Sequence, residues 1–211
     1  MVRQMGLARD IAVGIREALA EPERQQQSAS ASAARAQRIE KKADGIAVEA
    51  RGTILRSQAS STIARLVDTA EAAIDELEQA AFFASLVDPS NFAAVVQTSL
   101  ASLCDAAVAG AEVAAKGLEA AAAAAEGDSI DSADALAATD RLTDLEHVAD
   151  GAERAVTAAV LKDGGEAGAV LSVLELARGL ERATDRISAL GHLLHQHVMA
   201  DLSGSQRQGA W

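Results

Sequence analysis

The sequence predicts an all-α protein, a six-helix antiparallel bundle made of two three-helix repeats. Hydrophobic residues make up 49% of the chain but aromatic residues only 2%, so alanine and leucine must form most of the core. Such a core suits helices that approach one another closely, as they do in bundles. The chain has only 2 prolines, and its commonest residues are strong helix formers. No stretch alternates Val, Ile or Thr with polar residues as a strand does.

Six helices are expected, over residues 2–19, 28–56, 62–86, 90–125, 130–161 and 166–200. Proline, or a cluster of polar and small residues, separates each helix from the next. Pro22 ends the first helix, because proline disfavours helix at the residue before it. Asp88-Pro89-Ser90 marks a break and a restart, and Gly164-Gly165 separates the last two helices.

The connections are short, which places consecutive helices antiparallel. The second and third helices therefore form one hairpin around the polar segment 57–61, and the fifth and sixth form another. This arrangement predicts two repeats, residues 1–86 and 87–202, that pack as one domain. A flexible tail is expected over residues 203–211, which are rich in Ser, Gly and Gln.

The charge and the cysteine content exclude several classes of protein. The chain has 19 basic and 31 acidic residues, a net charge of -12. Nucleic-acid binding needs clustered Lys and Arg, so no nucleic-acid partner is expected, and direct docking on an anionic lipid surface is disfavoured as well. Cys104 is the single cysteine. It rules out an intramolecular disulfide, offers no zinc site, and is expected in the core.

The distribution of charge along the chain predicts a cytoplasmic location without direct membrane insertion. No stretch of about 18 apolar residues is free of charged residues, as a transmembrane helix would be. The N-terminal segment, residues 1–21, carries charges at intervals, and this pattern predicts an amphipathic helix. A signal peptide would instead have an uncharged apolar centre.

Acidic residues with a fixed spacing are the main functional signal. The chain contains 16 Glu and 15 Asp, so a Glu followed four residues later by Asp should occur about once by chance. It occurs four times, as Glu40/Asp44, Glu71/Asp75, Glu146/Asp150 and Glu181/Asp185. Residues four apart share one helix face, so each pair can present two carboxylates to one ion.

The four pairs are also placed symmetrically about the predicted turns. The pairs Glu40/Asp44 and Glu71/Asp75 lie symmetrically on either side of position 57.5. The pairs Glu146/Asp150 and Glu181/Asp185 lie in the same way about position 165.5. Residues equidistant from the turn of an antiparallel hairpin lie at the same height, so each hairpin gathers four carboxylates. Four such groups repel one another unless a cation lies between them, and oxygen ligands suit Mg²⁺, Ca²⁺, Mn²⁺ or iron. The eight residues are therefore candidate metal ligands in two clusters, and no catalytic residue is expected.

Two other interpretations of the acidic residues stay open. They could be the solvated faces of ordinary acidic helices, or nearby arginines could neutralise them, namely Arg141, Arg154, Arg178, Arg182 and Arg186. Glu78 and Glu153 continue the same helix faces and are more in keeping with surface than with ligands. His192, His195 and His197 lie near the end of the last helix, where the helix dipole favours histidine.

The motifs resemble those of the PhoU family, whose members have two three-helix repeats with two E(D)-x-x-x-D motifs in each. The chain most resembles the PhoU-like accessory proteins of Pit-type inorganic phosphate transporters. The resemblance covers residues 34–194, and the matching stretches are residues 39–44, 71–75, 145–150 and 181–185. One departure is the first hairpin turn, where that family usually has Thr-Pro-x-Asp and this chain has the polar segment 57–61.

The resemblance implies a non-enzymatic regulator of inorganic phosphate transport that binds multinuclear metal clusters. Its implied partner is an inorganic phosphate transporter, on which it would act in the cytoplasm or at the inner face of the membrane, and a homo-oligomer stays open. One alternative is a metal-free helical interaction module. Another is a di-iron or di-manganese carboxylate enzyme, which is disfavoured because such bundles use Glu-x-x-His. The residues three places after Glu146 and Glu181 are Ala149 and Thr184.

Overall fold

The structure is a computed structural model that describes residues 1–20, 25–57, 61–124 and 129–208. Side chains are described for residues 1–20, 29–57, 61–123 and 132–200. Six α-helices run through these residues: α1 (Val2–Ala20), α2 (Gln25–Ser57), α3 (Ser61–Ala84), α4 (Ala94–Ala124), α5 (Ser129–Asp163) and α6 (Ala167–Gln208). A short 3-10 helix, η2 (Pro89–Asn91), precedes α4.

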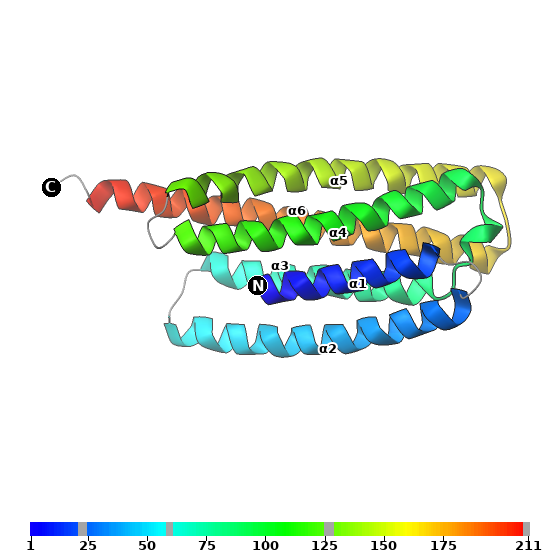
Figure 1. Ribbon diagram of the computed structural model, residues 1–211, viewed down its shortest axis with the longest axis horizontal. Helices are drawn as coiled ribbons and strands as arrows, with labels where there is room; N and C mark the ends of the chain where they lie inside the picture. Colours follow the sequence, from blue (N-terminus) through cyan, green and yellow to red (C-terminus); the bar gives the residue numbers. More distant parts are fainter. Residues whose placement is uncertain (21–24, 58–60, 125–128, 209–211) are drawn as a thin grey trace.

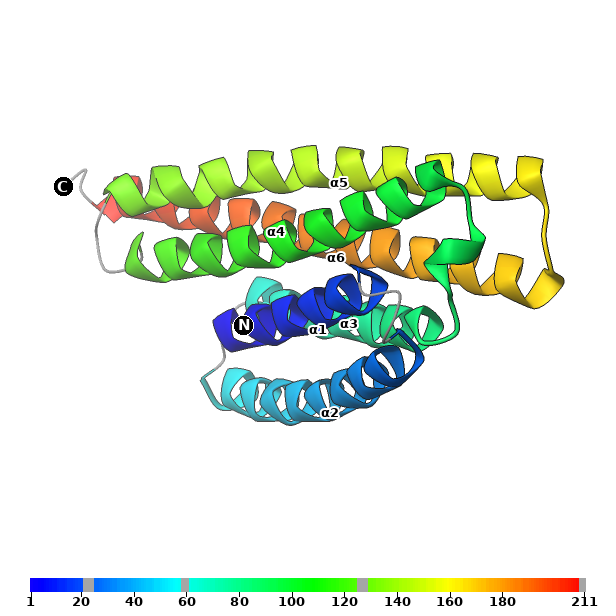
Figure 2. The same ribbon diagram turned by 45° about the vertical axis from the view of Figure 1, so that its right-hand side comes forward.

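The helices form an elongated bundle with their axes roughly along one direction (Figure 1), which confirms the predicted all-α fold. Helices α1, α2 and α3 pack on one another, and so do α4, α5 and α6. The two groups meet mainly where α3 packs on α6 and α1 packs on α4. Helix α2 packs on α1 and α3 and lies at the outside of the bundle (Figure 2). The second and third helices, and the fifth and sixth, form the predicted hairpins.

The helix boundaries lie within three residues of the predicted ones except at two places. Residues 90–93 were expected in the fourth helix, but η2 and an extended Phe92 precede α4, which begins at Ala94. The carboxylate of Asp88 accepts a hydrogen bond from the backbone N–H of Ser90 at 3.0 Å, and this cap holds the tight turn. At the other end, α6 continues to Gln208, past residue 200 and through most of the segment predicted as a tail. That segment contains no proline to stop a helix.

Small residues allow the helices to approach closely, as the alanine-rich composition predicted. A Cβ atom added at Gly117 of α4 would lie 2.8 Å from the Cβ of Ala138 on α5. A Cβ added at Gly179 of α6 would lie 3.1 Å from the Cβ of Ala80 on α3. Both glycines therefore occupy contacts where no larger residue fits without movement. Cys104 is fully buried in the core, as predicted.

Among the side chains that the structure describes, three ion pairs join the two groups of helices. Arg9 and Arg16 of α1 pair with Glu112 and Asp105 of α4, at 2.7 and 2.8 Å between the side-chain nitrogen and oxygen atoms. Arg182 of α6 pairs with Glu76 of α3 through Nε and Oε2 at 2.8 Å. Arg182 also donates from Nη2 to Oε1 of Gln79 at 3.3 Å. Their side chains are partly or largely exposed, so solvent screens these pairs and they add little to the packing of α1 on α4 and of α6 on α3.

Helix α4 lies at the centre of the bundle, in contact with α1, α5 and α6. Among the described helices it alone, over Ala94–Ala123, is long and apolar enough to cross a membrane by length and composition. The central helix of a water-soluble bundle has the same composition, because its neighbours cover it on several sides. The fold is therefore compatible with a soluble protein.

Candidate functional site

The first hairpin brings three of the predicted ligands together. Glu40 and Asp44 lie on α2, and Asp75 lies opposite them on α3. Each offers a carboxylate oxygen, and the three oxygens lie within 4.8 Å of one another. The two α2 residues are partly buried and Asp75 is exposed, so the group opens to solvent at the seam between the helices. We call Glu40, Asp44 and Asp75 the first carboxylate group.

Glu71, the fourth predicted ligand of this hairpin, is held by a cation of the protein itself. The guanidinium of Arg51 on α2 forms an ion pair with Glu71, and a second with Asp68 at 2.8 Å between Nη2 and Oδ1. Glu71 therefore pairs with Arg51, whereas Asp75, one turn further along α3, converges with Glu40 and Asp44. The sequence interpretation missed Arg51. About the centre at position 57.5, Arg51 is level with residue 64 and not with Asp68 or Glu71, so the symmetry that gathers the acids does not reveal it.

The first carboxylate group carries the electrostatic strain expected of unneutralised acids. Burial, and then the neighbouring charge of Asp44, raise the pKa of Glu40 above its ordinary value. The side chain of Asp75 is exposed overall, but the protein around its carboxyl removes part of the solvent and raises its pKa, and the charges of Glu71 and Asp44 raise this pKa further. The charge of Glu78 is the smallest of the causes that raise the pKa values of Glu40 and Asp75, and Glu78 lies outside the first carboxylate group. Each carboxylate thus destabilises the ionised form of its neighbours.

The second hairpin places its acids near one another in a looser arrangement. Burial raises the pKa of Glu181, and the charges of Asp185, Asp150 and Glu153 raise it further. Asp150 is paired with Arg154, one turn away on α5, at 2.6 Å between Nη2 and Oδ2. Within the described side chains, no three carboxylates of this hairpin lie within 4.8 Å of one another. Glu146 instead lies 3.6 Å from the Nε2 atom of its neighbour His147.

The remaining residues considered in the sequence fall outside the first carboxylate group. Arg182 pairs with Glu76, and Arg178 with Glu175 at 3.0 Å, so neither forms an ion pair with a predicted ligand of its own hairpin. The charge of Arg182 nevertheless partly offsets the rise in the pKa of Glu181. The side chains of His192 and His195 are exposed. The histidines His192, His195 and His197 do not belong to any described group of three potential ligands within 4.8 Å of one another.

The first carboxylate group has the donor set of a hard-cation site. Carboxylate oxygens are the ligands that Mg²⁺, Ca²⁺ and Mn²⁺ prefer. Three carboxylates from two helices supply three of the six or more oxygens that such ions take, and the open side of the site can supply water. A bound cation would remove the repulsion that raises the pKa values of Glu40 and Asp75. The residues therefore fit a cation chemically.

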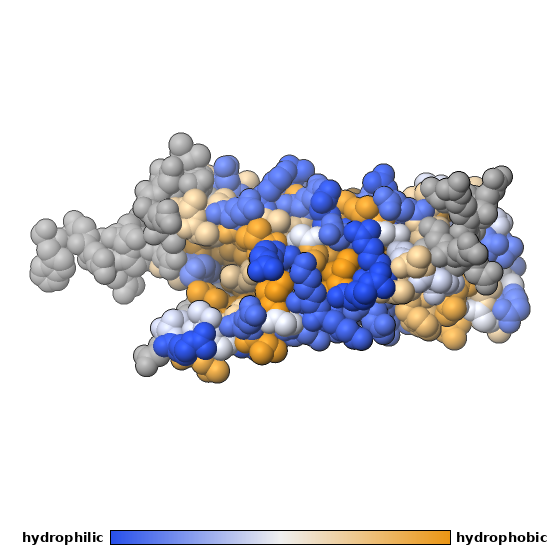
Figure 3. Space-filling view, turned by 60° about the horizontal axis from the view of Figure 1, so that its bottom comes forward, coloured by the Kyte–Doolittle hydropathy of each residue, from blue (hydrophilic) through white to orange (hydrophobic). Residues whose placement is uncertain are grey.

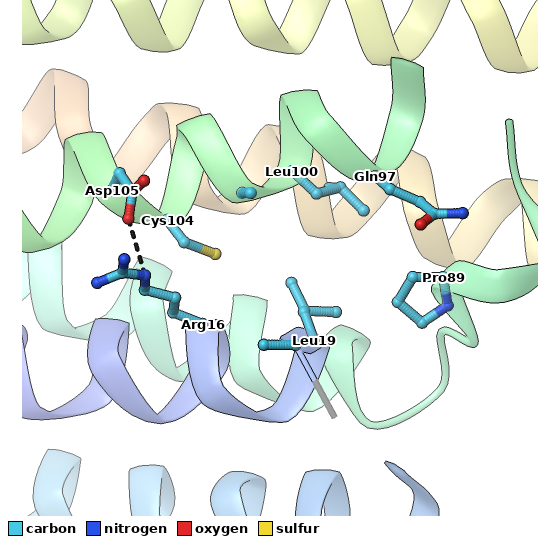
Figure 4. A pocket seen from close by; sticks show the side chains of 9 residues that line it. Arg16, Leu19, Pro89, Gln97, Leu100, Cys104 and Asp105 are labelled. Atoms are coloured by element: carbon cyan, nitrogen blue, oxygen red, sulfur yellow. Dashed lines mark ion pairs between the residues drawn. The ribbon is translucent and has the colours of Figure 1, made fainter. Parts of the chain in front are cut away.

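A small cavity of about 160 Å³ lies elsewhere, between the end of α1, Pro89 and α4. Figure 4 shows Cys104 facing this space beside the ion pair of Arg16 with Asp105. Burial raises the pKa of the Cys104 thiol to about 12, so the thiol stays protonated and is a poor nucleophile. The cavity is smaller than the roughly 300 Å³ at which small-molecule pockets begin. This cavity is therefore not the candidate site, which we place at the acidic hairpins because carboxylates from two helices converge there.

Comparison of the chain with models of protein families finds no match, and no curated protein matches it either.

Proposed function

We propose that the protein is a PhoU-like accessory regulator of inorganic phosphate transport that binds metal ions through its acidic hairpins. The observation that carries this proposal is the convergence of Glu40, Asp44 and Asp75 from two helices to within 4.8 Å. The ions it would take are hard divalent or trivalent cations, iron, Mn²⁺, Mg²⁺ or Ca²⁺. The motif resemblance supports the transport role and a cytoplasmic site of action on a phosphate transporter.

A bound cation would link α2 to α3. Helix α2 lies at the outside of the bundle and packs on α1 and α3, so these two helices hold it in place. Carboxylates of the first carboxylate group repel one another when no cation is present, which works against close packing of the hairpin seam. A cation reverses this effect and holds the two helices together. Metal loading would thus set how firmly the outer helix is docked, which is a property that a partner protein can recognise.

The alternative of a metal-free interaction module is favoured by a different observation. Arg51 neutralises Glu71, and Arg154 neutralises Asp150, so two of the eight predicted ligands already have a cation. If protein cations satisfied the remaining acids in the same way, no metal would be needed. The second hairpin, with its looser geometry, is the part of the molecule to which this alternative applies best.

Metal content distinguishes the two functions. We would purify the protein without chelators and compare its bound metals by elemental analysis with those of Glu40→Ala and Glu146→Ala. Glu49→Ala is the matched control, because Glu49 is an exposed acid of the same helix outside the carboxylate group. We expect Glu40→Ala to lose metal and Glu49→Ala to keep it. Equal metal content in all four proteins would refute the metal site.

The transport role needs a separate measurement. Uptake of radiolabelled phosphate would be compared in cells that lack the protein and in the same cells supplied with wild type or Glu40→Ala. We expect wild type, and not Glu40→Ala, to restore the normal rate of uptake. Identical uptake with and without the protein would contradict the transport role and leave the metal site standing.

A further inference from the structure

Basic residues are concentrated in one helix of this acidic protein. Helix α2 contains six basic and three acidic residues, whereas the rest of the chain contains 13 basic and 28 acidic residues. The helix therefore carries a net charge of +3 and the remainder -15. The net charge of the whole chain disfavours docking on an anionic lipid surface. That single number does not reveal that basic residues are gathered in α2.

The basic helix is also the outermost one. It packs on α1 and α3, and the opposite side of the helix faces away from the bundle (Figures 1 and 2). A Cβ atom added at Gly45, on this side, would meet no other atom within 4 Å. Figure 3 looks toward the side on which α2 lies and shows hydrophilic residues with hydrophobic ones between them.

Four cations lie within two turns of this outward side. Their side chains are exposed, and none forms an ion pair within 4 Å with any residue whose side chain the structure describes: Arg35, Arg38, Lys41 and Lys42. Glu40 lies among them in sequence but points to the first carboxylate group, so it does not cancel their charge at the surface. The N-terminal half of the outward face is therefore strongly positive.

Large apolar side chains follow on the same face. Val48 is 66% exposed and Leu55 is 81% exposed. They are seven residues apart, and Val48 is seven residues after Lys41, so all three lie along one line of the helix. Exposed apolar residues beside Lys and Arg are the pattern of helices that lie in the interface of a membrane. We call the outward side formed by Arg35, Arg38, Lys41, Lys42, Val48 and Leu55 the basic face of α2.

We propose that the basic face of α2 docks the protein on an anionic lipid surface. Clusters of Lys and Arg on an amphipathic helix bind anionic headgroups, and Val48 and Leu55 would enter the boundary between headgroups and acyl chains. The acidic remainder of the chain does not prevent this, because repulsion is screened beyond about 10 Å at ordinary salt. A nucleic acid would use the cations but not the two aliphatic side chains. The inference stands apart from metal binding and from the phosphate-transport role.

Co-sedimentation with lipid vesicles tests this inference directly. The full chain, kept in a chelator so that no cation bridges acids to lipid, would be mixed with vesicles of phosphatidylcholine alone or with phosphatidylglycerol at about two to one. We expect binding only to the anionic vesicles, and weaker binding at about 0.5 M salt than at 0.05 M. A cation near such a surface contributes about fivefold to binding. Replacing Arg35, Arg38, Lys41 and Lys42 by Gln should therefore weaken binding at least tenfold.

A matched variant removes the same charge from other exposed positions: Arg3→Gln, Lys116→Gln, Arg141→Gln and Lys162→Gln. It should bind vesicles as wild type does. Val48→Ser with Leu55→Ser should weaken binding at both salt concentrations, because its effect is not electrostatic. Circular dichroism would verify that each variant is folded. Absence of vesicle binding, equal loss in the matched variant, or binding to a nucleic-acid homopolymer in place of vesicles would each overturn the inference.

Discussion

Arg51 pairs with Glu71, the predicted ligand that lies outside the first carboxylate group, and under the proposed function it sets how many protein ligands a cation would meet. Its guanidinium pairs with both Glu71 and Asp68 on α3. The Arg51 side chain is 39% exposed and that of Asp68 is 57% exposed, so solvent screens the pair and its contribution to folding is small. The ion pair of Arg51 with Glu71 matters more for the candidate metal site. Glu71 lies one turn of α3 from Asp75, so its carboxylate would be within reach of a cation if Arg51 did not pair with it.

Arg51→Gln should therefore strengthen cation binding. Glu71 would lose its internal cation and become available as a fourth carboxylate for an ion at the site. We expect a several-fold lower dissociation constant for Mn²⁺ by titration calorimetry, with a free energy of unfolding changed by less than about 1 kcal/mol. Arg56→Gln is the control, since Arg56 is an exposed arginine of the same helix whose described contact is with Thr53. A weaker or unchanged affinity in Arg51→Gln would show that Glu71 does not face the ion.

At the scale of helices and hairpins, the sequence predicted most of what the structure shows. Helix propensity and turn residues predicted six helices and both hairpins, because these depend on local signals. The convergence of Glu40 with Asp75 also followed, since antiparallel geometry fixes which residues are level. The looser second hairpin did not follow from the sequence. Its acids obey the same spacing, but the distances between their carboxylates depend on side-chain orientation, which spacing does not specify. The i,i+4 pair of Asp150 with Arg154 is one of the alternatives that the sequence left open.

Close helix packing gives a prediction for α4 and α5. A Cβ atom at Gly117 would lie 2.8 Å from the Cβ of Ala138 and 3.2 Å from Cδ2 of Leu194, so Gly117→Ala should lower the free energy of unfolding by about 1–3 kcal/mol. Gly151→Ala is the matched control within α5, because its Cβ would meet nothing within 4 Å. It should raise the free energy of unfolding by about 0.5–1 kcal/mol through helix propensity. Urea denaturation measures both, and effects of the same sign would contradict the packing described.

For the whole molecule, the excess of acids governs how stability depends on pH. The pKa values of Glu40, Asp75 and Glu181 are raised in the folded protein, chiefly by burial and then by neighbouring carboxylates. The folded chain therefore binds protons at a higher pH than the unfolded chain, for which the ordinary values are 4.5 for Glu and 3.8 for Asp. The free energy of unfolding falls as pH rises across the interval between the unfolded and the folded pKa values.

Without metal, the midpoint of urea denaturation should therefore be higher near about pH 5 than near pH 7. Glu166 has the opposite shift, because backbone hydrogen bonds from Gly168 and Ala169 lower its pKa, and its contribution to stability is lost only below 4.5. Addition of Mn²⁺, or the substitution Glu40→Gln, should reduce the difference between the two pH values. If the difference in the urea midpoint between the two pH values were larger in Glu40→Gln than in wild type, the raised pKa of Glu40 would not be a cause of the pH dependence.

The first carboxylate group lies within one hairpin, and this has a consequence for the order of events during synthesis. All three of its residues fall between positions 40 and 75, so the group is complete once α3 has left the ribosome. Helices α4, α5 and α6 have not yet emerged at that stage. Because chains fold from the N-terminus as they emerge, a cation can bind to the nascent hairpin before the C-terminal helices pack on it. The supply of metal during translation, rather than after folding is complete, would then decide how many protein molecules carry a metal ion.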